Sequence, residues 1–289
     1  MSEDRIHALT CWNGPVSLEP FVGGITNLNY RVRDGDACYM VRLCEDKHHL
    51  GIDRRNERAC QEAAVRAGVA PEVVHYDGGI LVSRFVDAPP LSAEDVRDRT
   101  LLTRLGTVLR RLHHARDELT GEMLYFCPFQ TIRTYAATAM RMNARLPEGI
   151  EAHLQDAQRL SRELTSFHPT LCHNDLLPVN IIDNGQTLWL VDWEYAGIGN
   201  PLFDIASISS NSQLSDDLEA VLLEAYTGTV DEQLRREVRI LKAVSLLREA
   251  LWSVIQSVAS KIDFDYEQYA AANIAAYQQA RDQLDLNNA

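Results

Sequence analysis

Four residues that could act together in catalysis lie close to one another in the second half of the chain. His173, Asp175 and Asn180 have the spacing H-x-D-x-x-x-x-N, and Asp192 follows after a predicted hairpin. A carboxylate beside an alcohol can orient the hydroxyl and accept its proton. Amide and carboxylate oxygens are the hard donors that Mg²⁺ prefers, together with water and phosphate oxygens. The spacing therefore predicts Asp175 as a base, with Asn180 and Asp192 as metal ligands.

This spacing is typical of a kinase catalytic loop, in which these groups serve phosphoryl transfer. An isolated aspartate would more simply cap a turn, but here an asparagine and an apolar strand ending in aspartate follow it. His173 is expected to shape the loop by hydrogen bonding. Glu194 would point to the same side as Asp192 if the strand continued, and so would act near the metal or the substrate. A solvated carboxylate at a strand edge is the alternative for Glu194.

A glycine turn between two predicted strands could approach a phosphate group. Its residues are Gly23, Gly24, Thr26 and Asn27, in the segment GGITN. Glycines let backbone N–H groups come close to phosphate oxygens, and the Thr and Asn side chains add donors. The segment matches no standard phosphate-loop pattern, and an ordinary hairpin turn is the alternative.

An arginine and a glutamate occur in the order expected of a phosphate-side ion pair. Arg42, in YMVRL, has the position of the strand lysine of a kinase, and Glu57, in RRNERA, that of its helical glutamate partner. An arginine can hold phosphate oxygens while paired with a carboxylate; alone, each would be a surface charge. Val82 to Phe85 would offer backbone groups to adenine, unless the segment is simply a buried strand.

The elements that must position these residues fall into two groups along the chain. The pattern of residues 17–45 predicts antiparallel strands with a turn at Asp34-Gly35. A helix at 53–67 and two strands at 72–77 and 80–86 are predicted to follow. After Pro89-Pro90 the pattern becomes helical, apart from a strand pair between Asn180 and Asp192; the predicted helices are 93–116, 130–145, 149–166, 214–227, 231–258 and 266–284. We predict an α+β, bilobal, protein-kinase-like fold, with a nucleotide-binding lobe at 1–86 and a catalytic, substrate-binding lobe at 87–289.

Composition excludes several classes of protein. A net charge of −13 argues against a nucleic-acid partner, because phosphate backbones require clustered Lys and Arg. The N-terminal segment is too polar for a signal peptide, and no apolar run approaches the roughly 20 residues of a membrane span. The six cysteines form no C-x-x-C pair and are expected to be reduced thiols. These features predict a soluble, cytoplasmic protein.

Several stretches together resemble the choline/ethanolamine kinase family, in its bacterial choline-kinase-like branch within the aminoglycoside-phosphotransferase-like group. They are GGITNLNYRV, YMVRL with RRNE, LRRLHH, HNDLLPVNII, LVDWEYAGIGNPLFDIA and LWSVIQSVASKIDFDYEQY. The resemblance implies ATP and Mg²⁺ as cofactors and phosphoryl transfer to a small cationic amino-alcohol. By position it also implies that Asp204 supports the catalytic loop.

The resemblance implies that the cationic head of the acceptor lies among aromatic rings, where cation–π attraction replaces hydration. The matching residues here are Trp252, Tyr269 and Tyr195. Glu249 stands where relatives often carry a second Trp, and Asn211 where they carry a carboxylate. Glu249 and Trp252 are i and i+3 on a predicted helix and can face one pocket, although Trp252 could equally belong to the apolar core of that helix.

We therefore expect a choline kinase that forms phosphocholine. Ethanolamine, thiamine, a sugar or an aminoglycoside-like alcohol is the nearest alternative, because Glu249 also suits a primary amine. A pseudokinase that binds without turnover is a further alternative; the presence of the base and both metal ligands argues against it.

Overall fold

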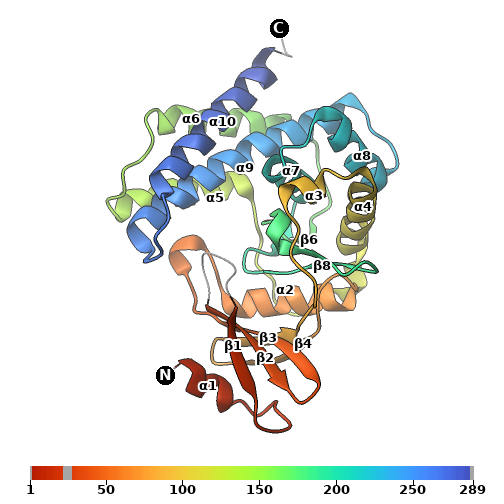
Figure 1. The fold of residues 1–289 in the computed structure, drawn as a ribbon. Coiled ribbons are helices and arrows are strands. Elements are labelled where there is room, and N and C mark those ends of the chain that lie inside the picture. Colours follow the sequence, from red (N-terminus) through yellow and green to blue (C-terminus); the bar gives the residue numbers. More distant parts are fainter. Residues whose placement is uncertain (1, 22–27, 287–289) are drawn as a thin grey trace.

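The computed structural model describes residues 2–21 and 28–286, which form a small sheet and a larger helical region (Figure 1). The antiparallel sheet has the order β1-β2-β3-β5-β4; its strands are β1 Ser17–Phe21, β2 Leu28–Asp34, β3 Ala37–Leu43, β4 Val73–Asp77 and β5 Ile80–Arg84. Alternate residues such as Val32 and Val41 are buried, as in a sheet with one covered face. The predicted turn closes β2 onto β3, and Gly35 adopts a φ of 60°, which costs little without a Cβ.

Helix α2, Arg54–Arg66, lies between the sheet and the helical region (Figure 1). It begins at Asp53, whose carboxylate accepts hydrogen bonds from the backbone N–H groups of Arg55 and Asn56 and so satisfies two unpaired donors of the first turn. Glu57 lies on the buried face of α2. The helix therefore carries a carboxylate into the space between the sheet and the catalytic loop.

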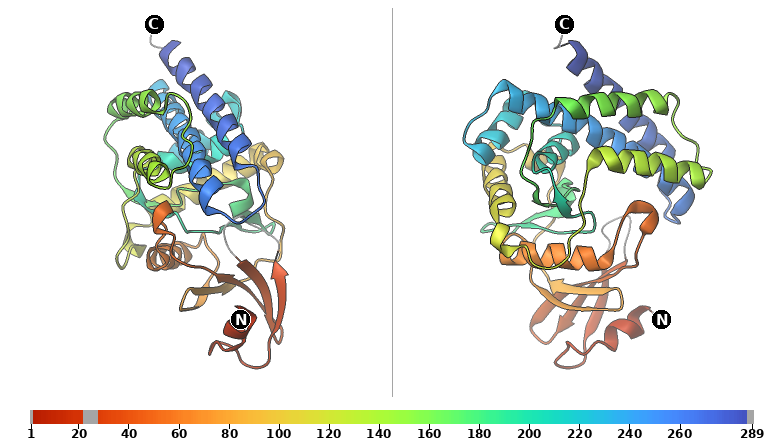
Figure 2. Two further views of the ribbon diagram at one scale, coloured as in Figure 1. Left: turned by 90° about the vertical axis from the view of Figure 1, so that its left-hand side faces the viewer. Right: turned by 180° about the vertical axis from the view of Figure 1, so that it is seen from behind.

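The chain after residue 92 is mostly helical, as predicted. The longer helices are α4 Arg99–His114, α5 Pro128–Arg141, α6 Ile150–Leu160, α7 Leu202–Asn211, α8 Asp216–Thr227, α9 Glu232–Ala259 and α10 Tyr266–Leu286. Helices α9 and α10 pack along each other, and α5 and α7 also pack against α9, as the two further views show (Figure 2). Within the described residues no helix is both long enough and apolar enough to cross a membrane.

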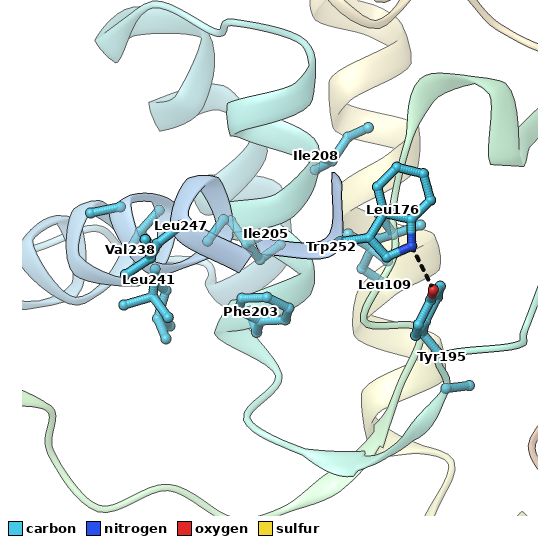
Figure 3. Packing of buried hydrophobic residues seen from close by; sticks show 14 of the residues in the cluster. Leu109, Leu176, Tyr195, Phe203, Ile205, Ile208, Val238, Leu241, Leu247 and Trp252 are labelled. Atoms are coloured by element: carbon cyan, nitrogen blue, oxygen red, sulfur yellow. Dashed lines mark hydrogen bonds between the residues drawn. The ribbon is translucent and has the colours of Figure 1, made fainter. Parts of the chain in front are cut away.

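The structure differs from the sequence prediction in three helices. The predicted helix 93–116 is divided into α3, Ala93–Val96, and α4, because Asp98 caps a new helix start. Helix α1, Ser2–His7, and helix α7 were not predicted. In α7, the serines and the asparagine have weak helix propensity, but its apolar side chains are buried among the helices around α9, and this packing overrides propensity (Figure 3).

Two short antiparallel strand pairs contain the segment that carries the predicted catalytic residues. Strands β7, Ile181–Asp183, and β8, Leu188–Leu190, form the predicted pair. Strands β6, Thr170–Cys172, and β9, Gly197–Gly199, form a second pair that was not predicted. The backbone N–H of Leu190 donates to the carbonyl of Val69, so β8 is held against the segment after α2.

Candidate functional site

Asp204, at the start of α7, holds the loop that follows β6. Its carboxylate is fully buried and accepts hydrogen bonds from the backbone N–H groups of His173, at 2.8 Å, and Asn174, at 2.7 Å. Asn174 adopts a φ of 63°, an uncommon value for a residue with a Cβ, and its side chain donates to the carbonyl of Tyr195. These contacts fix the backbone at residues 173 and 174, and so orient the next residue, Asp175.

His113 on α4 is a second support that the sequence prediction did not assign. Its Nε2 lies 3.0 Å from Oδ2 of Asp204, and its Nδ1 lies 2.8 Å from the hydroxyl of Tyr226. The ring is buried between these partners. His113 is the first histidine of the LRRLHH stretch, but only the fold shows that it contacts Asp204.

His173 has the structural role expected of it. Its Nε2 lies 2.9 Å from the carbonyl oxygen of Val191, so this nitrogen carries the proton and donates it. Burial lowers the pKa of His173 below its ordinary value. The ring also packs against Trp193, with ring centroids 4.7 Å apart. His173 thus ties the catalytic loop to the turn after β8.

Asn180 and Asp192, the two predicted metal ligands, are held next to the catalytic loop. The side-chain amide of Asn180 donates to the carbonyl of Asp175 at 2.9 Å, and its backbone carbonyl accepts from the N–H of Val191. Strand β8 ends at Leu190, and the chain changes direction at Asp192, whose φ of 67° is left-handed. The amide and carboxylate oxygens form a donor set that suits Mg²⁺.

The predicted ion pair of Arg42 and Glu57 is present and includes Asp192. One nitrogen of Arg42, Nη1, lies 2.7 Å from Glu57 and 2.6 Å from Asp192. Burial lowers the pKa of Arg42, but the carboxylates of Asp192 and Glu57 outweigh burial and raise it above its ordinary value. A permanent positive charge therefore lies beside the predicted metal ligand.

Glu194 occupies a place different from the expected one. The strand ends before Asp192, and the side chain of Glu194 is buried, 3.0 Å from Nη1 of Arg54. The same Arg54 nitrogen lies 2.6 Å from Glu57. The expectation that Glu194 extends a strand beside Asp192 is wrong, because the chain turns at the left-handed Asp192. Arg54, which sequence reasoning missed, joins Glu194 to the Arg42 network through Glu57.

Asp175 is paired with an arginine that sequence reasoning also missed. Both Nη1 and Nη2 of Arg248 lie 3.2 Å from Oδ1 of Asp175, and Nη1 lies 3.0 Å from Glu249. Burial raises the pKa of Asp175 to about 7; the Arg248 guanidinium opposes this shift, and Glu249 adds to it. A charged Arg–Glu pair inside the apolar stretch of α9 was the available signal for Arg248.

The four residues expected around the acceptor lie together. The indole N–H of Trp252 donates to the hydroxyl of Tyr195 at 3.0 Å (Figure 3). The hydroxyl of Tyr269 donates to Glu249 at 3.3 Å, and the rings of Trp252 and Tyr269 meet edge to face, 6.5 Å between centroids. Glu249 and Trp252 both come from α9 and are buried. The carboxylate of Glu249 therefore lies next to two aromatic rings. Arg248 contacts both Glu249 and Asp175 and so connects this group to Asp175.

Asn211, which stands where relatives carry a carboxylate, has an amide that donates hydrogen bonds instead. Its amide donates to the carbonyl of Leu176 and to the hydroxyl of Ser207, each at 3.3 Å. Leu176 directly follows Asp175. Asn211 therefore supports the catalytic loop from the end of α7.

The predicted nucleotide side is described only in part. Gly23, Gly24, Thr26 and Asn27 lie outside the described residues. The side chain of Val82 is fully buried in the core of the sheet. Phe85 follows β5, and its N–H donates to the carbonyl of Cys38, while Arg31 lies over its ring at 4.5 Å.

A cavity of about 230 Å³ is lined in part by Glu194 and Tyr195, two of the residues predicted to lie near the acceptor. Its lining also includes Tyr135, together with Thr131 and Gln130 of α5. Tyr135 is buried, and its hydroxyl donates to the carbonyl of Leu50. The cavity therefore lies between α5 and the segment that precedes α2, with Tyr195 in its wall.

Comparison with known proteins supports one chemistry for this arrangement. Residues 17–247 match the family described as "Phosphotransferase enzyme family". A crystal structure of a choline/ethanolamine kinase family protein from Mesorhizobium loti is 30% identical with a TM-score of 0.80, covering 97% of this chain and 95% of that one.

Two further relatives cover most of the chain at lower identity. A probable ethanolamine kinase A from Dictyostelium discoideum is 27% identical, covering 94% of this chain and 88% of its own length. The crystal structure of choline kinase LicA from Streptococcus pneumoniae is 24% identical with a TM-score of 0.77, covering 92% of this chain and 94% of that one. The fold is thus the protein-kinase-like fold of phosphotransferases, as predicted.

Proposed function

Because this chain belongs to the phosphotransferase enzyme family, and within it to the choline/ethanolamine kinase family, we propose that it transfers the γ-phosphoryl group of ATP to a small amino-alcohol. The observation that carries the proposal is the grouping of Asp175, Asn180 and Asp192. Asn180 donates to the backbone of Asp175, and Asp192 follows directly after the residue bonded to Asn180. The chain is an alcohol-acceptor phosphotransferase by its family, and this argues against the pseudokinase alternative.

In the proposed mechanism Asp175 orients the acceptor hydroxyl. Arg248 contacts Oδ1 of Asp175, and no described residue donates to Oδ2. The hydroxyl can therefore donate to Oδ2 and pass its proton there as the bond to phosphorus forms. Catalysis then comes mainly from holding the two reactants in line.

The phosphate side of the mechanism uses Arg42 with Asn180 and Asp192. Mg²⁺ held by these two oxygen ligands would neutralise the charge of the phosphate groups during transfer. Arg42 keeps its charge beside Asp192 and can hold phosphate oxygens. Residues 1–86 would form the nucleotide-binding lobe and 87–289 the catalytic and substrate-binding lobe. In the first of these, Gly23, Gly24, Thr26 and Asn27 would contact phosphates, and Val82 to Phe85 would contact adenine.

Choline is the acceptor that the sequence predicts, and the streptococcal relative named as a choline kinase supports it. Tyr195, Trp252 and Tyr269 would surround the cation, with Glu249 and Glu194 nearby as carboxylates. A specific contact favours ethanolamine as a second candidate: Glu249 lies beside Tyr269 and can accept hydrogen bonds from a primary ammonium, which a quaternary ammonium cannot donate.

The test measures ADP formation from ATP with each alcohol and identifies the phosphorylated product by ³¹P NMR. We expect saturable turnover that disappears with EDTA and returns with added Mg²⁺. An ATP turnover that no amino-alcohol stimulates would contradict the proposal. Because the readout includes the product, phosphorylation of another alcohol would be recognised as such.

A further inference from the structure

Arg248 connects the proposed base to the carboxylate expected at the cationic end of the acceptor. Its Nη1 lies 3.2 Å from Oδ1 of Asp175 and 3.0 Å from Oε1 of Glu249, and its Nη2 also lies 3.2 Å from Oδ1 of Asp175. A single guanidinium nitrogen therefore contacts one oxygen of each carboxylate. This bridge sets the spacing between the two carboxylates.

The bridging arginine is less accessible than the two carboxylates that it joins. The side chain of Arg248 is 1% exposed, whereas those of Asp175 and Glu249 are 17% and 11% exposed. Among the described residues, none donates to Oδ2 of Asp175, and Oε2 of Glu249 accepts only from the hydroxyl of Tyr269. Each carboxylate thus uses one oxygen for Arg248 and keeps the other for a further partner. Arg248 itself needs no contact with the acceptor.

Aromatic rings hold the guanidinium of Arg248 in place. Its central carbon lies 4.7 Å from the ring centroid of Tyr195 and 5.8 Å from that of Phe126, within the range of cation–π attraction. The hydroxyl of Tyr195 in turn accepts the indole N–H of Trp252 (Figure 3). Contacts with two rings and two carboxylates restrict the guanidinium to one position, which a fixed spacing between functional groups requires.

Resting on the proposed function, we infer that Arg248 is a positioning residue that selects the acceptor by the distance between its hydroxyl and its cationic nitrogen. The hydroxyl donates to Oδ2 of Asp175, and the nitrogen lies toward Glu249 and Tyr269. Because Arg248 holds the two carboxylates one guanidinium apart, an amino-alcohol with two carbons between hydroxyl and nitrogen fits both. Each further methylene displaces one end, and a misplacement of about 1 Å can cost about 10²-fold in rate.

Two series of acceptors that differ only in this distance test the inference on the wild-type enzyme. Ethanolamine, 3-amino-1-propanol and 4-amino-1-butanol carry a primary ammonium; choline and its three-carbon homologue carry a trimethylammonium group. In whichever series the enzyme accepts, we expect kcat/KM to fall by about 10- to 100-fold with the first added methylene. ADP formation gives the rates, and ³¹P NMR identifies each phosphorylated product.

Substitution of Arg248 should weaken the discrimination by length. In Arg248→Met the two carboxylates repel each other without a cation between them, so the ratio of kcat/KM for the two-carbon and three-carbon acceptors should fall to about threefold or less. The kcat for the two-carbon acceptor should fall by about 10-fold or more, with KM for ATP unchanged. Arg248→Lys keeps the charge without the guanidinium geometry and should give an intermediate ratio. Arg239→Met is the matched control, because Arg239 also lies on α9 and pairs with two carboxylates, those of Asp216 and Glu232; it should leave the ratio unchanged.

A ratio of two acceptors measured on one enzyme preparation does not depend on the fraction of enzyme that is folded, so a loss of stability alone leaves it unchanged. Equal kcat/KM for two-carbon and three-carbon acceptors in the wild type would overturn the inference and leave the amino-alcohol kinase standing. The wild-type ratio in Arg248→Met, or in Arg248→Lys if the methionine variant does not fold, would overturn it as well. If the wild type phosphorylates no acceptor of either series, the proposed function itself fails.

Discussion

Arg42 on β3 and Asp192 after β8 are 150 residues apart in the sequence, yet Nη1 of Arg42 lies 2.6 Å from Oδ1 of Asp192. The same nitrogen lies 2.7 Å from Glu57 on α2. The contact joins the sheet to the segment that carries the predicted metal ligand. A change at Arg42 should therefore affect both nucleotide binding and the position of Asp192.

Replacement of Arg42 by methionine should lower kcat/KM for ATP by about 100-fold or more, because a charge aimed at phosphate oxygens is lost. Arg42→Lys should lose less, since it keeps the charge but not the guanidinium geometry. The measurement is steady-state kinetics with varied ATP, together with nucleotide binding by calorimetry. Arg33→Met, at an exposed position on the neighbouring strand β2, is the control; equal losses in both variants would contradict a specific role for Arg42.

Asp175→Asn should lower kcat by about 10²- to 10⁴-fold, since the side chain can no longer accept the hydroxyl proton. Nucleotide affinity should change little, because the proposed role of Asp175 is to hold the acceptor hydroxyl. The measurement is acceptor-dependent ADP formation alongside nucleotide binding. Asp183→Asn, in the nearby hairpin and paired with Arg104, is the control. Turnover above a few per cent of wild type would exclude Asp175 as the base.

Asp204→Asn should destabilise the fold by about 2–4 kcal/mol, because a buried carboxylate with charge-assisted hydrogen bonds is replaced by an amide that brings its own donors. The lost partners are the N–H groups of His173 and Asn174 and the ring of His113. Urea unfolding measures the loss. Asp263→Asn, at an exposed loop position, should be nearly neutral; similar costs in both variants would refute the supporting role of Asp204.

The free energy of unfolding should decrease as the pH falls through the ordinary histidine pKa of about 6.5. Burial lowers the pKa of His173 in the folded protein, so below that value the unfolded chain binds the proton more readily than the folded one. The stabilisation is present above pH 6.5 and is lost toward acid. Urea unfolding of wild type and His173→Gln between pH 5 and pH 8 measures it. The variant should show a shallower slope and the exposed His168→Gln the wild-type slope; identical slopes in all three proteins would contradict the prediction.

Much of the fold and the candidate catalytic groups could be predicted from the sequence. The hairpin at Gly35, the helix with Glu57 and the spacing of Asp175, Asn180 and Asp192 are local patterns, and the structure contains each of these elements. Local patterns failed where packing decides. Helix α7 has weak propensity and forms because its apolar side chains are buried, and Glu194 turns away because the chain is left-handed at Asp192.

The sequence by itself predicted the reaction class, because the spacing of Asp175, Asn180 and Asp192 along one segment is a short-range property of the chain. Only the tertiary structure decided which side chains surround Asp175. Arg248 comes from α9, Asp175 from the loop after β6, and Tyr195 from the segment before β9, and no spacing in the sequence brings them together. Their contact depends on the packing of α7 against α9, since side chains far apart in the chain meet only when the helices that carry them bury a common core.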